Sequence, residues 1–221
     1  MEMTKANLTE LIFILDRSGS MGGLESDTIG GFNAMLKKQQ EEQGECRITT
    51  ALFDHEYELL HDRIDIKAVS PITDKEYFVR GNTALLDAIG ITINKISAVQ
   101  KNTSEEYRAD KVLFIITTDG MENASREFTY GKIKEMIEKR KSENSWEFIF
   151  LGANIDAVDV AERFGIDKNR AQNFHSDSKG VQLNYSVLSK TVSQYRQSAK
   201  SEPIAENWSE SIEQDFESRK K

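Results

Sequence analysis

The chain has 221 residues, of which 38% are hydrophobic, enough for one sizeable α/β domain and too few for two comfortable ones. Its formal net charge of -8 argues against a surface that follows nucleic-acid phosphates, since such a surface needs clustered Lys and Arg. The single cysteine, Cys46, excludes a disulfide framework, favours a reducing compartment and is expected to pack as a small hydrophobe.

The first predicted element is a buried strand over the unbroken apolar run Leu11–Leu15. A run so short and so apolar is typical of a central parallel strand that is covered on both faces. A helical stripe follows over residues 24–43 and ends at Gly44. Strands are then predicted at Cys46–Phe53 and Tyr57–Ile64. Because only three residues join them, we expect an antiparallel pair with the second strand at or near an edge of the sheet.

The second half of the chain alternates helices with strands. The predicted elements are a helix that opens at Leu85, a strand over Val112–Thr118, a helix around 133–137, a strand over Trp146–Leu151, a short helix that ends at Gly165, a weak strand over Ala171–Phe174 and a last helix over 181–195. This alternation implies βαβ crossovers. We therefore predict a doubly wound, Rossmann-like α/β fold: a mostly parallel central sheet with one antiparallel edge strand and helices on both faces.

Residues 1–200 are expected to form this single domain, followed by a charged, flexible tail over residues 201–221. Trp208 and Phe216 are the main large apolar groups of the tail. No stretch approaches the roughly 18 apolar residues of a membrane helix, and residues 1–9 lack the apolar core of a secretion signal. We expect a cytoplasmic protein with no membrane partner and no nucleic-acid partner.

Oxygen-bearing side chains gather where the predicted strands end. Asp16, Ser18 and Ser20 follow the first strand, Asp119 follows the strand that ends at Thr118, and Thr83 precedes the helix that opens at Leu85. Open α/β sheets bind ligands at the carboxyl ends of strands, where the strand order reverses. Two carboxylates and three hydroxyls form an all-oxygen set, the type that suits Mg²⁺, Mn²⁺ or Ca²⁺. The sequence therefore predicts a divalent metal site, with Mg²⁺ the first choice.

Plainer interpretations stay open for each residue taken alone. Asp16 or Ser18 could cap the next helix, Thr83 could be only an N-cap, and Asp119 could be only part of a turn. The joint presence of all five in this order favours the metal site. The three histidines are too scattered for a convincing zinc set: His55, His61 and His175. The loop after Asp119 contains Met121, Glu122 and Asn123, which could shape a partner surface or be plain loop residues.

The pattern of these side chains resembles the metal-ion-dependent adhesion site of the von Willebrand factor A domain family. The family pattern is Asp-x-Ser-x-Ser after the first strand, a Thr that opens a later helix, and an Asp after the fourth strand. The five positions are filled in the expected order by Asp16, Ser18, Ser20, Thr83 and Asp119. The likeness extends over about residues 8–199. It implies that the three hydroxyls touch the metal and that the two carboxylates act directly or through water.

The same resemblance implies a function. The chain is similar to compact, stand-alone bacterial or phage-type members, which bind proteins and are not enzymes. We expect an intracellular module whose partner, a protein with an exposed acidic residue, completes the coordination of Mg²⁺ within a stress, defence or signalling system. One alternative is a Mg²⁺-dependent phosphohydrolase with Asp16 as nucleophile, although Ser18 stands where a second carboxylate is needed. Another is a fold-only domain with a non-regulatory metal site.

Overall fold

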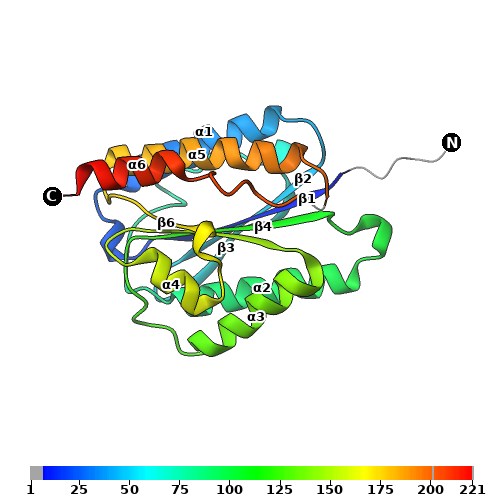
Figure 1. Cartoon of the computed structure of the whole chain (residues 1–221), viewed down its shortest axis with the longest axis horizontal. Coiled ribbons are helices and arrows are strands. Elements are labelled where there is room, and N and C mark those ends of the chain that lie inside the picture. The colour runs from blue at the N-terminus through cyan, green and yellow to red at the C-terminus, as the bar shows by residue number, and fades with distance from the viewer. Residues whose placement is uncertain (1–6, 201, 221) are drawn as a thin grey trace.

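A six-stranded sheet lies at the centre of the computed structural model, which describes residues 7–200 and 202–220 (Figure 1). The strands are β1 (Thr9–Asp16), β2 (Cys46–Phe53), β3 (Tyr57–Asp65), β4 (Lys111–Thr118), β5 (Glu147–Gly152) and β6 (Ala171–Asn173). Their order is β3-β2-β1-β4-β5-β6. Every neighbouring pair is parallel except β2 with β3. The predicted mostly parallel sheet with one antiparallel edge strand is confirmed.

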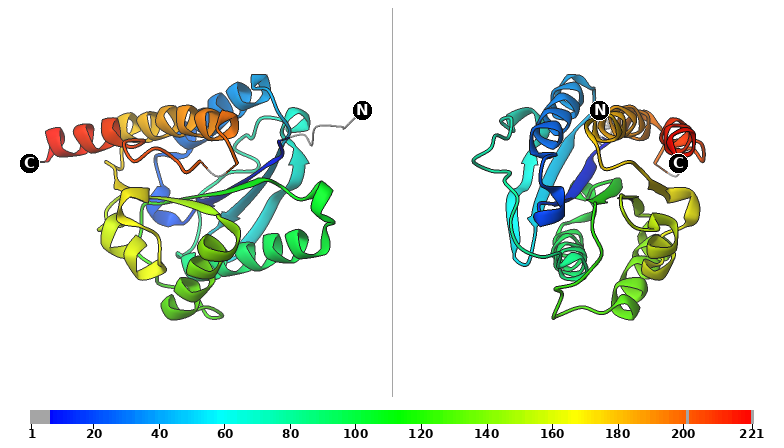
Figure 2. Two further views of the ribbon diagram at one scale, coloured as in Figure 1. Left: turned by 45° about the vertical axis from the view of Figure 1, so that its right-hand side comes forward. Right: turned by 90° about the vertical axis from the view of Figure 1, so that its left-hand side faces the viewer.

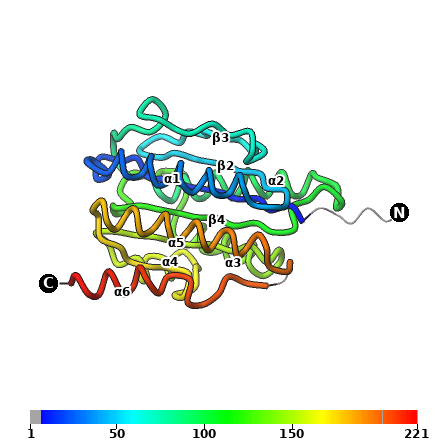
Figure 3. Tube along the Cα trace, turned by 90° about the horizontal axis from the view of Figure 1, so that it is seen from above, coloured from blue at the N-terminus to red at the C-terminus, as the bar shows by residue number. Residues whose placement is uncertain are grey.

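Helices cover both faces of this sheet. They are α1 (Glu25–Glu41), α2 (Leu85–Asn102), α3 (Tyr130–Asn144), α4 (Ala157–Phe164), α5 (Ser178–Gln197) and α6 (Glu210–Arg219). Short 3-10 turns lie at Gly19–Met21, Ile66–Ala68, Glu105–Tyr107 and Lys168–Arg170. Helices α1, α5 and α6 form one layer and α2, α3 and α4 the other (Figures 1 and 2). Within the first layer, α5 lies between α1 and α6 (Figure 3).

The composition of β1 follows from this layering. Side chains alternate along a strand, so Leu11, Phe13 and Leu15 enter the core under α1 and α5. Ile12 and Ile14 enter the other core, which is completed by residues of α2, α3 and α4. All eight residues of β1 are buried. A strand buried on both faces needs apolar residues at successive positions, and this explains the unbroken run that marked the strand in the sequence.

The C-terminal segment differs from the expected flexible tail. Residues 202–220 pack along the outer side of α5, and Ile204, Trp208 and Ile212 are buried in the core on that face. The Trp208 indole N–H donates to the Asn169 carbonyl at 2.8 Å. Arg219 lies 2.5 Å from both Asp177 and Asp215. The segment is docked because its apolar groups lie on one side, although charged residues dominate its composition.

No helix in residues 7–200 and 202–220 combines the length and the hydrophobicity that a membrane crossing requires.

Candidate metal centre

The predicted site lies where the order of the strands in the sheet reverses. β1 and β4 are parallel neighbours, with Leu15 opposite Thr117, so their carboxyl ends meet at the same edge. The chain leaves β1 toward β2 on one side and leaves β4 toward β5 on the other. This arrangement makes the β1–β4 boundary the switch point of the sheet, the usual place for a ligand in such folds.

Three hydroxyls converge at this edge. Ser18 Oγ lies 3.0 Å from Ser20 Oγ, and Thr83 Oγ1 donates to Ser18 Oγ at 3.0 Å. Gly120 packs against the same group, since a β carbon at that position would lie 2.9 Å from Ser20 Oγ and 3.4 Å from Thr83 Oγ1. The residue after Asp119 must therefore be small for the loop after β4 to approach the hydroxyls.

The two carboxylates differ in how their oxygens are used. Asp16 accepts from the Ser18 N–H at 2.7 Å and from the Thr118 hydroxyl at 2.5 Å. Asp119 Oδ2 accepts from the Ser176 hydroxyl at 3.3 Å. Its other oxygen, Oδ1, is buried and has no hydrogen-bond partner among the described residues. A buried carboxylate oxygen without a donor is costly unless a cation lies beside it, so this observation fits a bound metal ion.

Burial also changes the acidity of both groups. It raises the pKa of Asp16 to about 6, against the hydrogen bonds from Thr118 and Ser18, and it raises the pKa of Asp119. Because folding raises the pKa of Asp16, protonation of this carboxyl stabilises the metal-free fold. This stabilisation is complete below the ordinary pKa of 3.8 and is lost as the pH rises through about 6. A divalent cation would compensate the buried charge.

Hydrogen bonds from the surrounding loops hold the site residues. The Thr83 N–H donates to Asn123 Oδ1 at 2.9 Å, and the Asn123 N–H donates back to the Thr83 carbonyl at 3.0 Å. The Gly19 N–H donates to the Gly81 carbonyl at 3.0 Å. The Tyr77 hydroxyl donates to the Asp16 carbonyl at 2.5 Å. These contacts fix the three separate segments that supply the predicted ligands.

The structure thus brings together all five predicted residues, and their role as metal ligands stays a prediction. It does not use Thr83 as an N-cap: α2 is preceded by Ala84, while Thr83 points to Ser18. Sequence reasoning missed the supporting roles of Thr118 and Ser176. Thr118 directly precedes Asp119, which was a usable signal, whereas nothing in the local sequence marked Ser176.

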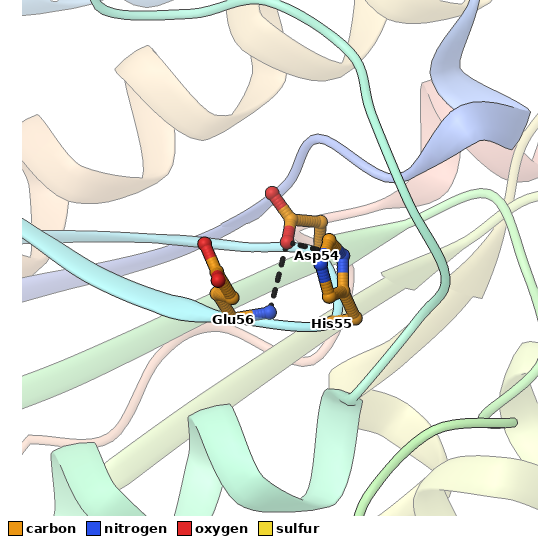
Figure 4. Close-up of side chains that lie close together, drawn as sticks. All are labelled: Asp54, His55 and Glu56. Atoms are coloured by element: carbon orange, nitrogen blue, oxygen red, sulfur yellow. Dashed lines mark hydrogen bonds and ion pairs between the residues drawn. The ribbon is translucent and has the colours of Figure 1, made fainter.

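A second group of metal-ligating types lies in the β2–β3 turn. Ligand atoms of Asp54, His55 and Glu56 all lie within 4.8 Å of one another (Figure 4). However, Asp54 Oδ2 accepts from Arg17 at 2.9 Å and from Arg80 at 2.8 Å. Two guanidinium groups already neutralise this carboxylate, so the turn is a poor place for a further cation. The sequence prediction treated these residues as a tight connection and considered His55 only within a scattered histidine set that made an unconvincing zinc site.

Comparisons with known proteins were informative only at the level of structure. No family model matches the chain, and no curated protein matches its sequence. The von Willebrand factor domain of the type V pili tip protein Mfa5 from Porphyromonas gingivalis matches with a TM-score of 0.61 and 12% identity, covering 88% of this chain and 98% of that one. The low identity means that this match shows the fold alone.

Two further matches are structures of metal-bound proteins. Manganese-loaded TRAP from Plasmodium vivax has a TM-score of 0.53 and 21% identity, covering 72% of this chain and 61% of that chain. Proximal thread matrix protein 1 from the mussel byssus, with a zinc-occupied MIDAS motif, has a TM-score of 0.57 and 12% identity, covering 85% of this chain and 46% of that chain. This chain therefore spans less than two thirds of either protein.

Proposed function

Because this chain has the von Willebrand factor A fold, we propose that it is a metal-dependent protein-binding module, with Mg²⁺ as its ion. The residues that would hold the ion are Asp16, Ser18, Ser20, Thr83 and Asp119. The bound metal would supply an electrophilic position that accepts a carboxylate from an Asp or Glu of a partner protein. We place this activity inside a bacterial or phage-infected cell, in a stress, defence or signalling system.

One observation carries the proposal: the partnerless Oδ1 of Asp119 is buried at the strand edge where three hydroxyls converge. All candidate donors are oxygens, which favours a hard cation such as Mg²⁺, with Mn²⁺ or Ca²⁺ as substitutes. Manganese in TRAP and zinc in the mussel protein are properties of those two proteins and do not identify the ion of this chain.

The geometry favours binding over phosphoryl chemistry. A phosphohydrolase built on Asp16 needs a second carboxylate two residues later as general acid, and Ser18 stands there. The neighbouring cation, Arg17, is turned away from the hydroxyl cluster toward Asp54 and Glu58. We therefore propose no catalytic role for Asp16. Generic phosphatase substrates with Mg²⁺ present should remain unhydrolysed.

Millimolar Mg²⁺ should raise the unfolding midpoint of the protein, since a ligand that binds only the native state stabilises it. At one hundred times its Kd the gain is about 2.7 kcal/mol. Thr83→Ala should abolish most of this gain, whereas Thr103→Ala should keep it, because Thr103 caps the far end of α2 through the Val99 carbonyl. Thermal unfolding with a magnesium titration measures both. An unchanged midpoint of the unsubstituted protein would contradict the metal site.

Capture from a lysate of the native cell should retain a partner in Mg²⁺ and lose it in EDTA. Asp16→Ala should lose the same partner, since it removes one proposed ligand. Thr83→Ala serves as the second variant, because it deletes one hydroxyl and leaves the Asp16 hydrogen bonds in place. A partner that binds equally well without metal would overturn the proposed mechanism, and it would favour a domain whose metal site has no role in binding.

A further inference from the structure

One large apolar side chain beside the metal centre is left open to solvent. Among the described residues, four large hydrophobic side chains are exposed: Ile64, Phe78, Tyr107 and Met121. Met121 is the most exposed of them, at 73%. It directly follows Gly120, the residue whose backbone packs on the hydroxyls of Ser20 and Thr83. The apolar group therefore follows the proposed ligand Asp119 by two residues along the chain.

The loop that carries Met121 is held firmly. The Glu122 carboxylate accepts from the Leu86 N–H at 2.9 Å and from the Ser125 N–H at 2.8 Å, so it caps the first turn of α2. Asn123 forms the paired hydrogen bonds with Thr83 described above. Met121 therefore lies between the site and two anchored residues. Its exposure is a property of the folded loop and does not come from a loose segment.

The opposite side of the centre is different in character. Phe78 is 42% exposed, but the Arg17 and Arg80 guanidinium groups lie 5.4 and 5.7 Å from its ring centroid. His55 packs against Gly81 on this same side, next to β2. Met121 follows β4, on the other side of β1. An extended ligand that crosses the switch point would thus meet the 40% exposed Arg80, already paired with Asp54 and Glu56, at one end and the exposed thioether of Met121 at the other.

We infer that Met121 is a specificity contact, and that the partner places an apolar side chain on it within a few residues of the carboxylate that reaches the metal. This inference rests on the proposed function and adds the class of partner sequence: an acidic residue with an apolar neighbour in an extended segment. Methionine suits such a contact because its unbranched, polarisable side chain adapts to differently shaped apolar groups. Its burial adds affinity that a carboxylate alone does not supply.

The test uses a displayed library of short random peptides, each with one fixed Asp, selected on the full chain in Mg²⁺ and counter-selected in EDTA. Magnesium-dependent peptides should be enriched in Leu, Ile, Phe or Met near the Asp. Their affinity should fall about tenfold for Met121→Ser, which corresponds to about 1.4 kcal/mol. Met121→Leu should restore most of it. Tyr107→Ser is the matched control, because Tyr107 is 63% exposed near the amino end of β4, away from the site.

The outcomes separate the two proposals. Magnesium-dependent peptides without apolar enrichment, or with unchanged affinity for Met121→Ser, would overturn the role of Met121 and leave the metal-dependent binding intact. Failure to select any magnesium-dependent peptide would count against the proposed function itself, and the inference would fall with it. In every case the magnesium-induced rise in unfolding midpoint should be the same for Met121→Ser and for the unsubstituted protein, since this side chain is not a proposed ligand.

Discussion

Asp54→Ala should lower the free energy of unfolding by about 3 kcal/mol, because it removes the buried carboxylate partner of a fully buried guanidinium. The side chains of Arg17 and Asp54 are both fully buried, and their atoms Nε and Oδ2 are 2.9 Å apart. Burial alone would raise the pKa of Asp54, but hydrogen bonds from Arg80, the Glu56 N–H and Arg17 outweigh it and hold the pKa below its ordinary value. The carboxylate is therefore charged at neutral pH. Its removal strands the buried Arg17 charge, which then has only the 48% exposed Glu58 as its carboxylate partner.

Urea unfolding monitored by tryptophan fluorescence measures this loss. The matched control is Asp62→Ala, which breaks an ion pair with Lys95 whose side chains are 27% and 53% exposed, and should cost less than about 1 kcal/mol. The double variant Arg17→Met, Asp54→Ala should be more stable than Asp54→Ala alone, since it removes the stranded charge as well. If the double variant were less stable than the single one, the stranded charge would not be the cause.

Trp208→Ala should cost about 3 kcal/mol, the usual range for loss of a buried indole. Trp208 is only 7% exposed and ties the segment before α6 to the turn before β6. The unfolding midpoint should fall by roughly 6–12 °C for a chain of this size. Because Phe216 and Arg219 of α6 contact His175 and Asp177, amide exchange should also rise in the loop that contains Ser176.

Two controls accompany this variant. Trp208→Phe keeps most of the apolar volume and loses only the hydrogen bond to Asn169, so it should cost about 1 kcal/mol. Tyr107→Ala removes an exposed aromatic ring and should stay within about 0.5 kcal/mol of the unsubstituted protein. A Trp208→Ala protein with unchanged stability would mean that the C-terminal segment is not docked in solution.

The sequence predicted the sheet well because its signals are local. Buried strands read as apolar runs, and the three-residue β2–β3 connection leaves only an antiparallel arrangement. That the five candidate residues lie close together was predictable for the same reason, since they lie at strand ends or just before a helix, whereas their role as metal ligands stays a prediction. The contacts that position them come from distant segments: Ser176 reaches Asp119 across 57 positions of the chain. The local sequence pattern does not predict such a long-range contact.

The docked C-terminal segment shows how a weak signal was overlooked. Its apolar residues are spaced four apart, at Ile204, Trp208, Ile212 and Phe216. Such spacing favours one face, but the charged residues between these positions suggested a solvated tail. Arg17 was unpredictable for another reason. It stands between Asp16 and Ser18, where the residue pattern specifies no side chain, and only the fold decides that it turns toward Asp54.

The two ends of the described chain lie at opposite ends of the parallel strands. Asn7 contacts the end of α5 through the Arg196 carbonyl, at the amino end of β1, whereas Arg219 pairs with Asp177, next to Ser176 and the candidate metal centre (Figure 1). A purification tag or sensor attached at the N-terminal end would therefore leave the candidate metal site unobstructed. The same fusion placed after α6 would crowd the candidate metal site and would reduce the measured affinity without any change in the ligands.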